Sequence, residues 1–228
     1  MAKPRPGVAE VRGTGEVEAA SDTTRELAWE RREGYAWPVL ADGVWPMTIE
    51  EARCRLVGGE EPARARLWEG FVRWRRHVAQ ACPLGLTHWI NGSFVEGKPQ
   101  PRDVDVVSFV DGPSWDRLAG EALRQAHRLL HGRERTEAKY GCHAFMVRVH
   151  PPSHPKGSVF EQWREYWRWL FGWTSCKEGR AEPAAHHIKG IISISTGHDA
   201  PYVADERGNP CNNALVVAEL RRRGYRDP

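Results

Sequence analysis

The sequence lacks the patterns that mark secreted and membrane-spanning proteins. Its five cysteines are scattered and contain no C-x-x-C pair, which favours reduced thiols over a disulfide framework. No apolar run approaches the roughly 18 residues of a membrane span, and the N-terminal MAKPRPGVAEVRG has no apolar signal region. We therefore expect a cytoplasmic protein without a membrane partner.

An excess of one charge is also missing. Lys and Arg number 33 and Asp and Glu 30, so the net charge of +3 does not by itself indicate a nucleic-acid-binding protein. There are no internal repeats. A chain of 228 residues, 40% of them hydrophobic, can bury one sizeable core. We expect a disordered or loosely attached arm over 1–34, a folded domain over 35–196, and a C-terminal extension over 197–228 with a short helix in ALVVAELRRRG.

What the chain does contain is a succession of helical and strand patterns. Apolar residues at helical spacing predict helices after Thr48, which forms a capping-box pattern with Glu51, and over 62–80, 114–131 and 158–173. Ser114 is the expected N-cap of the third helix. Apolar runs predict strands at LTHWI, VDVVSFV, HAFMVRV and IKGIISIS. This order predicts an α+β fold, with a small mixed β-sheet flanked by helices.

Two helices have conspicuous surfaces. Four arginines of the helix over 62–80 occupy positions outside its apolar stripe: Arg64, Arg73, Arg75 and Arg76. We interpret them as solvated surface, with contact to phosphate or RNA as the alternative. In the helix over 158–173, Tyr166 and Trp169 fall outside the core stripe, and they are either part of the fold or a partner surface.

The most informative stretch is NGSFVEGKPQPRDVDVV, in which Asp103 and Asp105 open an apolar strand. Alternating side chains share a face, so the two carboxylates project to the same side and can share a cation. Hard oxygen ligands at this spacing suit Mg²⁺ or Mn²⁺, which in turn can hold the phosphates of a nucleotide. Upstream, Gly92 allows close backbone approach to a phosphate and Ser93 offers a hydroxyl. The alternative is a pair of solubilising charges at a strand edge.

The pattern of an apolar strand, Gly92-Ser93, a spacer, and Asp103-Val104-Asp105-Val106 resembles the signature of the polymerase-β-like nucleotidyltransferase superfamily. A closer likeness is to a small, little-characterised bacterial nucleotidyltransferase-like family with a GSF…KPxPxDVDVV motif, found in part beside toxin–antitoxin and phage-defence genes. The resemblance implies metal ligation by Asp103 and Asp105 and phosphate contact by Gly92 and Ser93.

Further candidate residues come partly from this resemblance and partly from the residues themselves. Lys98 is a candidate phosphate contact, and Lys189 of HHIKG can reach a triphosphate or belong to the sheet. The superfamily usually takes a third carboxylate from a following strand, and the corresponding position holds His143. An imidazole can act as a base or metal ligand, or its presence can mark a site that binds without turnover. A zinc site built from Cys142, His143, His150 and His154 is disfavoured by its spacing.

The resemblance therefore implies an Mg²⁺-dependent protein that moves a nucleotidyl group from a nucleoside triphosphate to a protein or RNA hydroxyl, in a toxin–antitoxin or phage-defence setting. One alternative is a catalytically impaired module of the same fold that senses nucleotide or binds a partner. Another is an RNA-binding protein that uses the arginine-rich helix and needs no metal.

Overall fold

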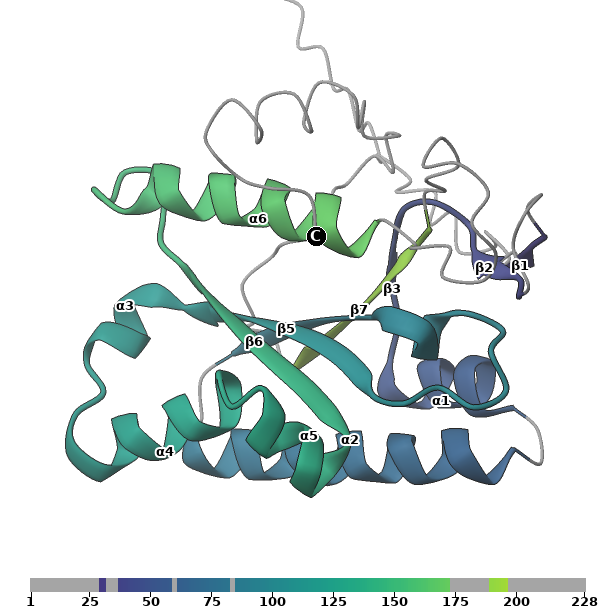
Figure 1. The fold of residues 1–228 in the computed structure, drawn as a ribbon. Coiled ribbons are helices and arrows are strands. Elements are labelled where there is room, and N and C mark those ends of the chain that lie inside the picture. Colours follow the sequence, from purple (N-terminus) through teal and green to yellow (C-terminus); the bar gives the residue numbers. More distant parts are fainter. Residues whose placement is uncertain (1–28, 32–36, 59–60, 83–84, 173–188, 197–228) are drawn as a thin grey trace, which may run out of the picture.

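The computed structural model describes residues 29–31, 37–58, 61–82, 85–172 and 189–196, and its centre is a five-stranded mixed sheet (Figure 1). The strand order is β3-β7-β4-β5-β6. The strands are β3 (Val44–Pro46), β4 (Leu86–Asn91), β5 (Val104–Asp111), β6 (Cys142–Val149) and β7 (Ile191–Thr196). β7 runs parallel to β3 and antiparallel to β4, while β5 is antiparallel to β4 and parallel to β6. β6 is therefore an edge strand.

Helices cover both faces of this sheet. One face packs against α1 (Ile49–Val57), α2 (Pro62–Ala81), α4 (Gly120–Leu130) and α5 (Glu134–Tyr140), and the other against α6 (Gly157–Phe171) (Figure 1). The expected α+β fold, a small mixed sheet flanked by helices, is confirmed. Alternation along β5 sends Val104 and Val106 into the larger core on the α2 side, and Val107 and Phe109 into the smaller core beneath α6.

Local sequence signals explain where the first two helices begin. The capping box of α1 is present, since the Glu51 backbone donates to Thr48 Oγ1 at 3.1 Å and the Thr48 backbone donates to Glu51 Oε2 at 2.7 Å. Pro62 opens α2 in the first turn, where its missing N–H costs nothing. The assignment of Arg64 to the surface was wrong, because this side chain is 7% exposed and lies under the 92–98 segment.

The single helix expected over 114–131 is two helices, α3 (Gly112–Asp116) and α4. Asp111, not Ser114, is the N-cap of α3, and its Oδ2 accepts from the Ser114 backbone at 2.8 Å. Gly120 has φ +58, a left-handed conformation that interrupts the helical path between the two segments. The broken helix turns the chain so that α4 returns along the α2 side of the sheet.

Several short elements were not predicted. They are α5, the first strand of the main sheet β3, the 3₁₀ turn η1 (Gly92–Val95), and the paired strands β1 (Trp29–Glu30) and β2 (Val39–Leu40). β1 lies within the expected arm, whose residues 1–28 lie outside the described part of the chain. The helix expected in ALVVAELRRRG also lies outside it. Among the described helices, none combines the length and the apolar composition needed to cross a membrane.

Candidate metal and nucleotide site

The site forms at the end of the sheet where β4 passes into η1 through Gly92. This glycine has φ +76, and a Cβ placed on it would lie 2.1 Å from Asp105 Oδ2. Both the left-handed backbone and the adjacent carboxylate therefore require glycine here. Asn91 fixes the turn from both sides, since its Oδ1 accepts from the Gly92 backbone at 2.7 Å and its Nδ2 donates to Gly190 O at 3.1 Å.

The segment after the turn is held by the buried guanidinium of Arg64. It donates to main-chain carbonyls at Leu56 (2.6 Å), Glu96 (3.0 Å), Lys98 (2.7 Å) and Phe94. Because the guanidinium donates to main-chain carbonyls and not to a carboxylate, it fixes the backbone conformation of the segment. The sequence did not indicate this role for Arg64.

Two of the predicted phosphate contacts lie in this segment. Ser93 is half-buried, and its hydroxyl makes no hydrogen bond within the described residues. Lys98 is half-buried as well, and its main-chain carbonyl accepts a hydrogen bond from Arg64. The Ser93 hydroxyl can therefore donate to a ligand bound beside the Gly92 turn.

Asp105 and His143 occupy opposite positions on the neighbouring strands β5 and β6. His143 Nδ1 lies 3.5 Å from Asp105 Oδ1. This contact is the main cause that raises the pKa of His143, and the charges of Asp105, Asp103 and Glu137 act in the same direction against partial burial. The imidazole thus lies on the same side of the sheet as Asp105, facing the α6 layer.

Asp103, Glu137 and His143 form a cluster whose potential ligand atoms all lie within 4.8 Å of one another. Asp103 directly precedes β5, and Glu137 comes from α5. Burial raises the pKa of Asp103, and the nearby charges of Asp105 and Glu137 raise it further. Three carboxylates and one imidazole therefore converge here, although each half-buried carboxylate disfavours ionisation of the others.

Glu137 is the functional candidate that the sequence did not reveal. It precedes the KYG sequence, in a stretch without a strand pattern, and belongs to a seven-residue helix that was not predicted. The Gly141 that ends α5 has φ +68 and leads the chain directly into β6, which brings Glu137 beside His143. A carboxylate five residues before Cys142 was the only available signal.

Lys189 lies next to the turn, where it is engaged by protein groups. Its Nζ donates to Gly92 O at 3.0 Å and to Glu96 Oε1 at 2.7 Å, and the side chain is 3% exposed. Burial lowers the pKa of Lys189, against the effect of Glu96 and Asp105. In this structure Lys189 supports the Gly92 turn through its bond to the Gly92 carbonyl.

The donor set fits a hard divalent cation. Asp103 and Glu137 offer carboxylate oxygens and His143 an imidazole nitrogen. Burial, and after it the charges of Asp105 and Glu137, raise the pKa of Asp103, and a cation bound here would favour its ionised form. Asp105 lies in contact with His143 and the Gly92 turn, so it connects the cation cluster to the turn. The arrangement can hold a cation beside a backbone turn suited to phosphate.

The fold and this site describe an α+β protein with an acidic cluster beside a glycine turn. The family described as "Family of unknown function (DUF6932)" matches residues 35–195. The chain belongs to this family. Comparison with the curated proteins and with the solved structures found no match.

Proposed function

We propose that this protein is an Mg²⁺- or Mn²⁺-dependent nucleotidyltransferase that uses a nucleoside triphosphate and a protein or RNA hydroxyl as acceptor. The observation that carries the proposal is the convergence of Asp103, Glu137 and His143 within 4.8 Å, with Asp105 between this cluster and the Gly92 turn. Glu137 supplies the third carboxylate that the strand position of His143 lacks. A toxin–antitoxin or phage-defence setting is supported by the motif resemblance alone.

In the proposed reaction, the acceptor oxygen forms a bond to the α-phosphorus while the bond from that phosphorus to the β-bridging oxygen breaks. Pyrophosphate leaves, and the hydroxyl proton passes to Glu137 or His143. A divalent cation held by Asp103, Glu137 and His143 would neutralise phosphate charge. The Gly92 turn positions the triphosphate, with the Ser93 hydroxyl as a donor.

The test is incubation of the protein with each α-labelled nucleoside triphosphate, Mg²⁺ and either total RNA or a cell lysate, followed by detection of labelled RNA or protein. We expect transfer by the native chain, and none by the Asp103→Asn/Asp105→Asn double variant. That variant should keep an unfolding temperature equal to or above that of the native chain, because like-charge repulsion is relieved. A double variant with unchanged transfer would refute the proposed site.

Separate variants assign the base. Because both residues also belong to the cation cluster, the rates are compared at saturating Mg²⁺. If Glu137 accepts the proton, Glu137→Gln then lowers the transfer rate by about 10²-fold or more and His143→Ala has the smaller effect. If His143 is the base, the two results are reversed. His143→Asp should tighten Mg²⁺ binding in either case, because it adds a negative charge beside Asp105.

A nucleotide-sensing module of the same fold is the second candidate. It is favoured by His143, which adds no negative charge at the register position beside Asp105, and by the pairing of Lys189 with Glu96. The sensing function predicts Mg²⁺-dependent triphosphate binding by calorimetry without any labelled product, and loss of that binding in the double variant.

A further inference from the structure

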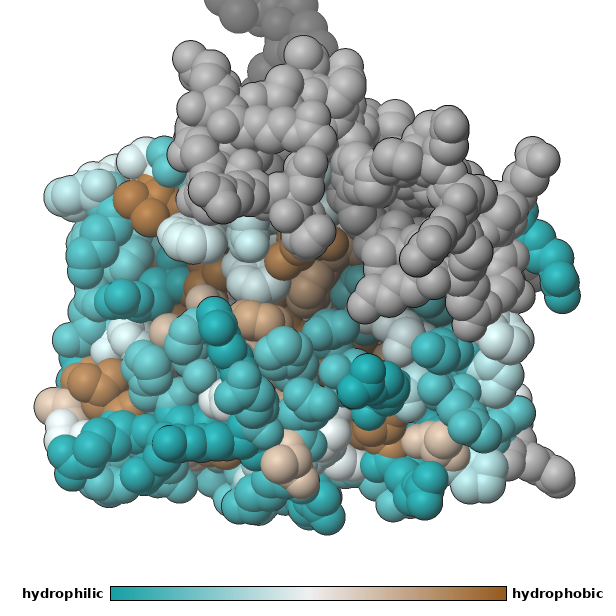
Figure 2. Space-filling model, in the orientation of Figure 1, coloured by the Kyte–Doolittle hydropathy of each residue, from teal (hydrophilic) through white to brown (hydrophobic). Residues whose placement is uncertain are grey.

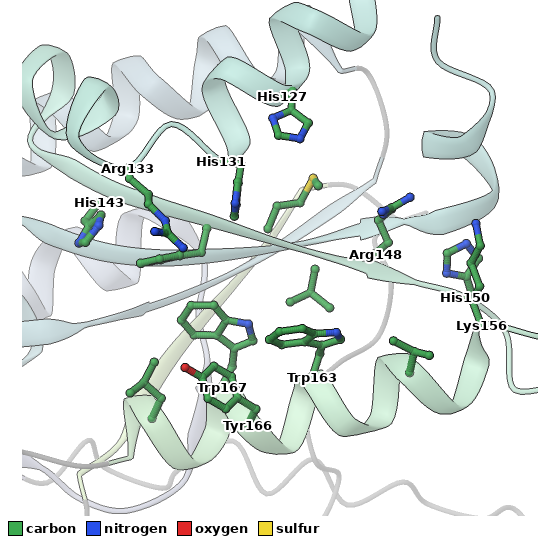
Figure 3. Close-up of a pocket in the computed structure, with 15 residues that line it drawn as sticks. His127, His131, Arg133, His143, Arg148, His150, Lys156, Trp163, Tyr166 and Trp167 are labelled. Atoms are coloured by element: carbon green, nitrogen blue, oxygen red, sulfur yellow. The ribbon is translucent and has the colours of Figure 1, made fainter. Parts of the chain in front are cut away.

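A groove of about 800 Å³ runs along the edge strand β6, from the metal and nucleotide site to the far end of the strand (Figure 3). α6 forms one wall, and residues at the ends of α4 and α5 form the other. His143 lies at one end and His150 at the other, a span of about 23 Å for seven strand residues. In the space-filling view, apolar side chains are visible beneath α6, bordered by hydrophilic ones over α4 and α5 (Figure 2).

The groove lining is basic. Among the residues that the structure describes, it includes Arg, Lys and His side chains but no Asp or Glu. Arg133 and His131 contribute from the α4–α5 side, and Arg148 and Lys156 from the far end (Figure 3). Burial and the charges of Arg133 and His127 lower the pKa of His131. The groove therefore suits a ligand that carries repeated negative charge.

The far end keeps a positive surplus even after its internal ion pairs are formed. Arg148, His150 and Lys156 all contact one carboxylate, that of Asp116, at 3.4, 3.1 and 2.9 Å. Lys156 and His150 hold the pKa of Asp116 well below its usual range. The single negative charge of Asp116 cannot neutralise both Arg148 and Lys156. The described residues at this end therefore also attract an anionic ligand.

A series of ring contacts runs along the same groove from the metal and nucleotide site. Ring centroids are separated by 4.6 Å between His143 and Phe145, 4.7 Å between Phe145 and Trp167, and 5.4 Å between Trp167 and Tyr166. Trp163, 5.5 Å from Tyr166, is 39% exposed. Such faces suit stacking with unpaired bases.

Two features of the lining are typical of a ligand-binding surface. Trp167 is 6% exposed, and its Nε1 has no hydrogen-bond partner among the described residues. A buried indole N–H ordinarily has one. Arg133 has φ 42 without being glycine, and its guanidinium lies 5.5 Å from the Phe145 ring centre, at the groove end nearest His143. Backbone strain of this kind gathers at binding sites.

We propose that this groove binds single-stranded RNA, with the strand running along β6 and its end directed toward the acidic cluster. The bases stack on Trp163 and on the half-buried Tyr166 and Phe145. The phosphates meet Arg133 at one end and Lys156 at the other. The inference rests on the proposed function in one respect: it names RNA, not protein, as the acceptor. Binding in the groove itself requires neither metal nor nucleotide.

The test measures fluorescence anisotropy of a labelled single-stranded RNA of about 10 nucleotides, within the site sizes of single-strand binders, with the full chain in the absence of Mg²⁺ and nucleotide. We expect binding that weakens with salt, and weaker binding of duplex RNA of the same length. Trp163→Ala should weaken binding about fivefold or more, and Trp163→Phe should restore most of it. Arg133→Gln should weaken binding and reduce the salt slope by about 0.7.

Matched controls lie on other surfaces. Trp29→Ala removes a tryptophan of similar exposure, and Arg76→Gln removes an exposed arginine from α2. Neither should change RNA affinity. If Arg76→Gln weakens binding while Arg133→Gln does not, RNA uses the arginines of α2 and the proposal is wrong. Equal affinity for duplex RNA, or equally strong competition by polyglutamate, would also overturn it, the latter indicating an acidic peptide at the edge of β6.

The Asp103→Asn/Asp105→Asn variant separates this inference from the proposed function. It should bind RNA as well as the native chain or more tightly, because two negative charges beside the groove are removed. RNA binding without any nucleotide transfer would retain the groove and refute the enzyme. Nucleotide transfer to protein, with no RNA binding in the groove, would retain the enzyme and refute the groove.

Discussion

Within the sheet, His88 is a titratable side chain that the fold keeps neutral. It is fully buried, with Nδ1 2.9 Å from Ser108 Oγ and its ring centroid 5.3 Å from that of Trp74. Burial lowers the pKa of His88 to about 3, and the charge of Arg75 acts in the same direction. In the unfolded chain the same imidazole titrates near 6.5.

His88 should therefore make the fold sensitive to acid. Its contribution to stability is complete above pH 6.5 and is lost as the pH falls toward 3, because the unfolded state gains a proton that the folded state excludes. The expected slope is about 1.4 kcal/mol per pH unit. Urea unfolding of the native chain and His88→Gln from pH 7 to pH 4 measures it. The difference between the two chains should change with pH, and a constant difference would contradict the assignment.

The residues proposed for the site differ in how far the sequence could predict them. Asp103, Asp105 and Gly92 follow from strand alternation and a turn, which are local properties, and the structure places all three around the β4–β5 end of the sheet. The partners of Lys189 depend on a contact across 93 residues with Glu96. No periodicity in the sequence records such a pairing.

At the scale of elements, the 92–98 segment depends on a side chain from α2. Arg64 joins the end of α1 to three carbonyls of this segment, and its guanidinium lies 4.9 Å from the Phe94 ring centre. A planar fork with five donors can satisfy these acceptors together, which a lysine cannot. The geometry of the segment after the Gly92 turn is thus set partly by a helix distant in sequence.

Replacement of Arg64 by lysine should consequently be costly although the charge is kept. We expect Arg64→Lys to lower the free energy of unfolding by about 3 kcal/mol, because buried carbonyls lose charged hydrogen bonds. Calorimetry should also show weaker triphosphate binding. Arg66→Lys serves as the control, because Arg66 is exposed and lies two residues after Arg64 on α2. It should leave both quantities unchanged. Equal stability of the two variants would show that Arg64 has no clamping role.

The elements themselves were predicted where their patterns were long. The helices α2 and α6 and the strands β4, β5 and β6 were all expected at close to their observed bounds. Short elements such as α5 and β3 are specified by tertiary contacts, since few residues cannot show a period. Because α5 was not predicted, Glu137 was not placed near the site, and the predicted site lacked this carboxylate.

For the whole molecule, the sheet order is the feature that the sequence did not predict. β7 lies between β3 and β4, where Leu86 pairs with Thr196 across 110 residues. A chain that ends at residue 188 would leave β3 unpaired and β4 with one open side. We expect such a chain to aggregate and to show no cooperative thermal unfolding, whereas a chain ending at residue 196 should unfold cooperatively. Circular dichroism and light scattering measure both, and a cooperative transition in the shorter chain would count against this role of β7.

The position of β7 also has a consequence for the order of events on the ribosome. The residues of the acidic cluster are all synthesised before Lys189 and β7, which must enter the middle of a sheet whose other strands already exist. Contacts this distant in sequence slow folding and leave strand edges exposed meanwhile. Because Lys189 supports the Gly92 turn, a nascent chain would lack the complete candidate site until its last described strand is inserted. If the proposed function holds, the growing protein would thus stay inactive until β7 has been made.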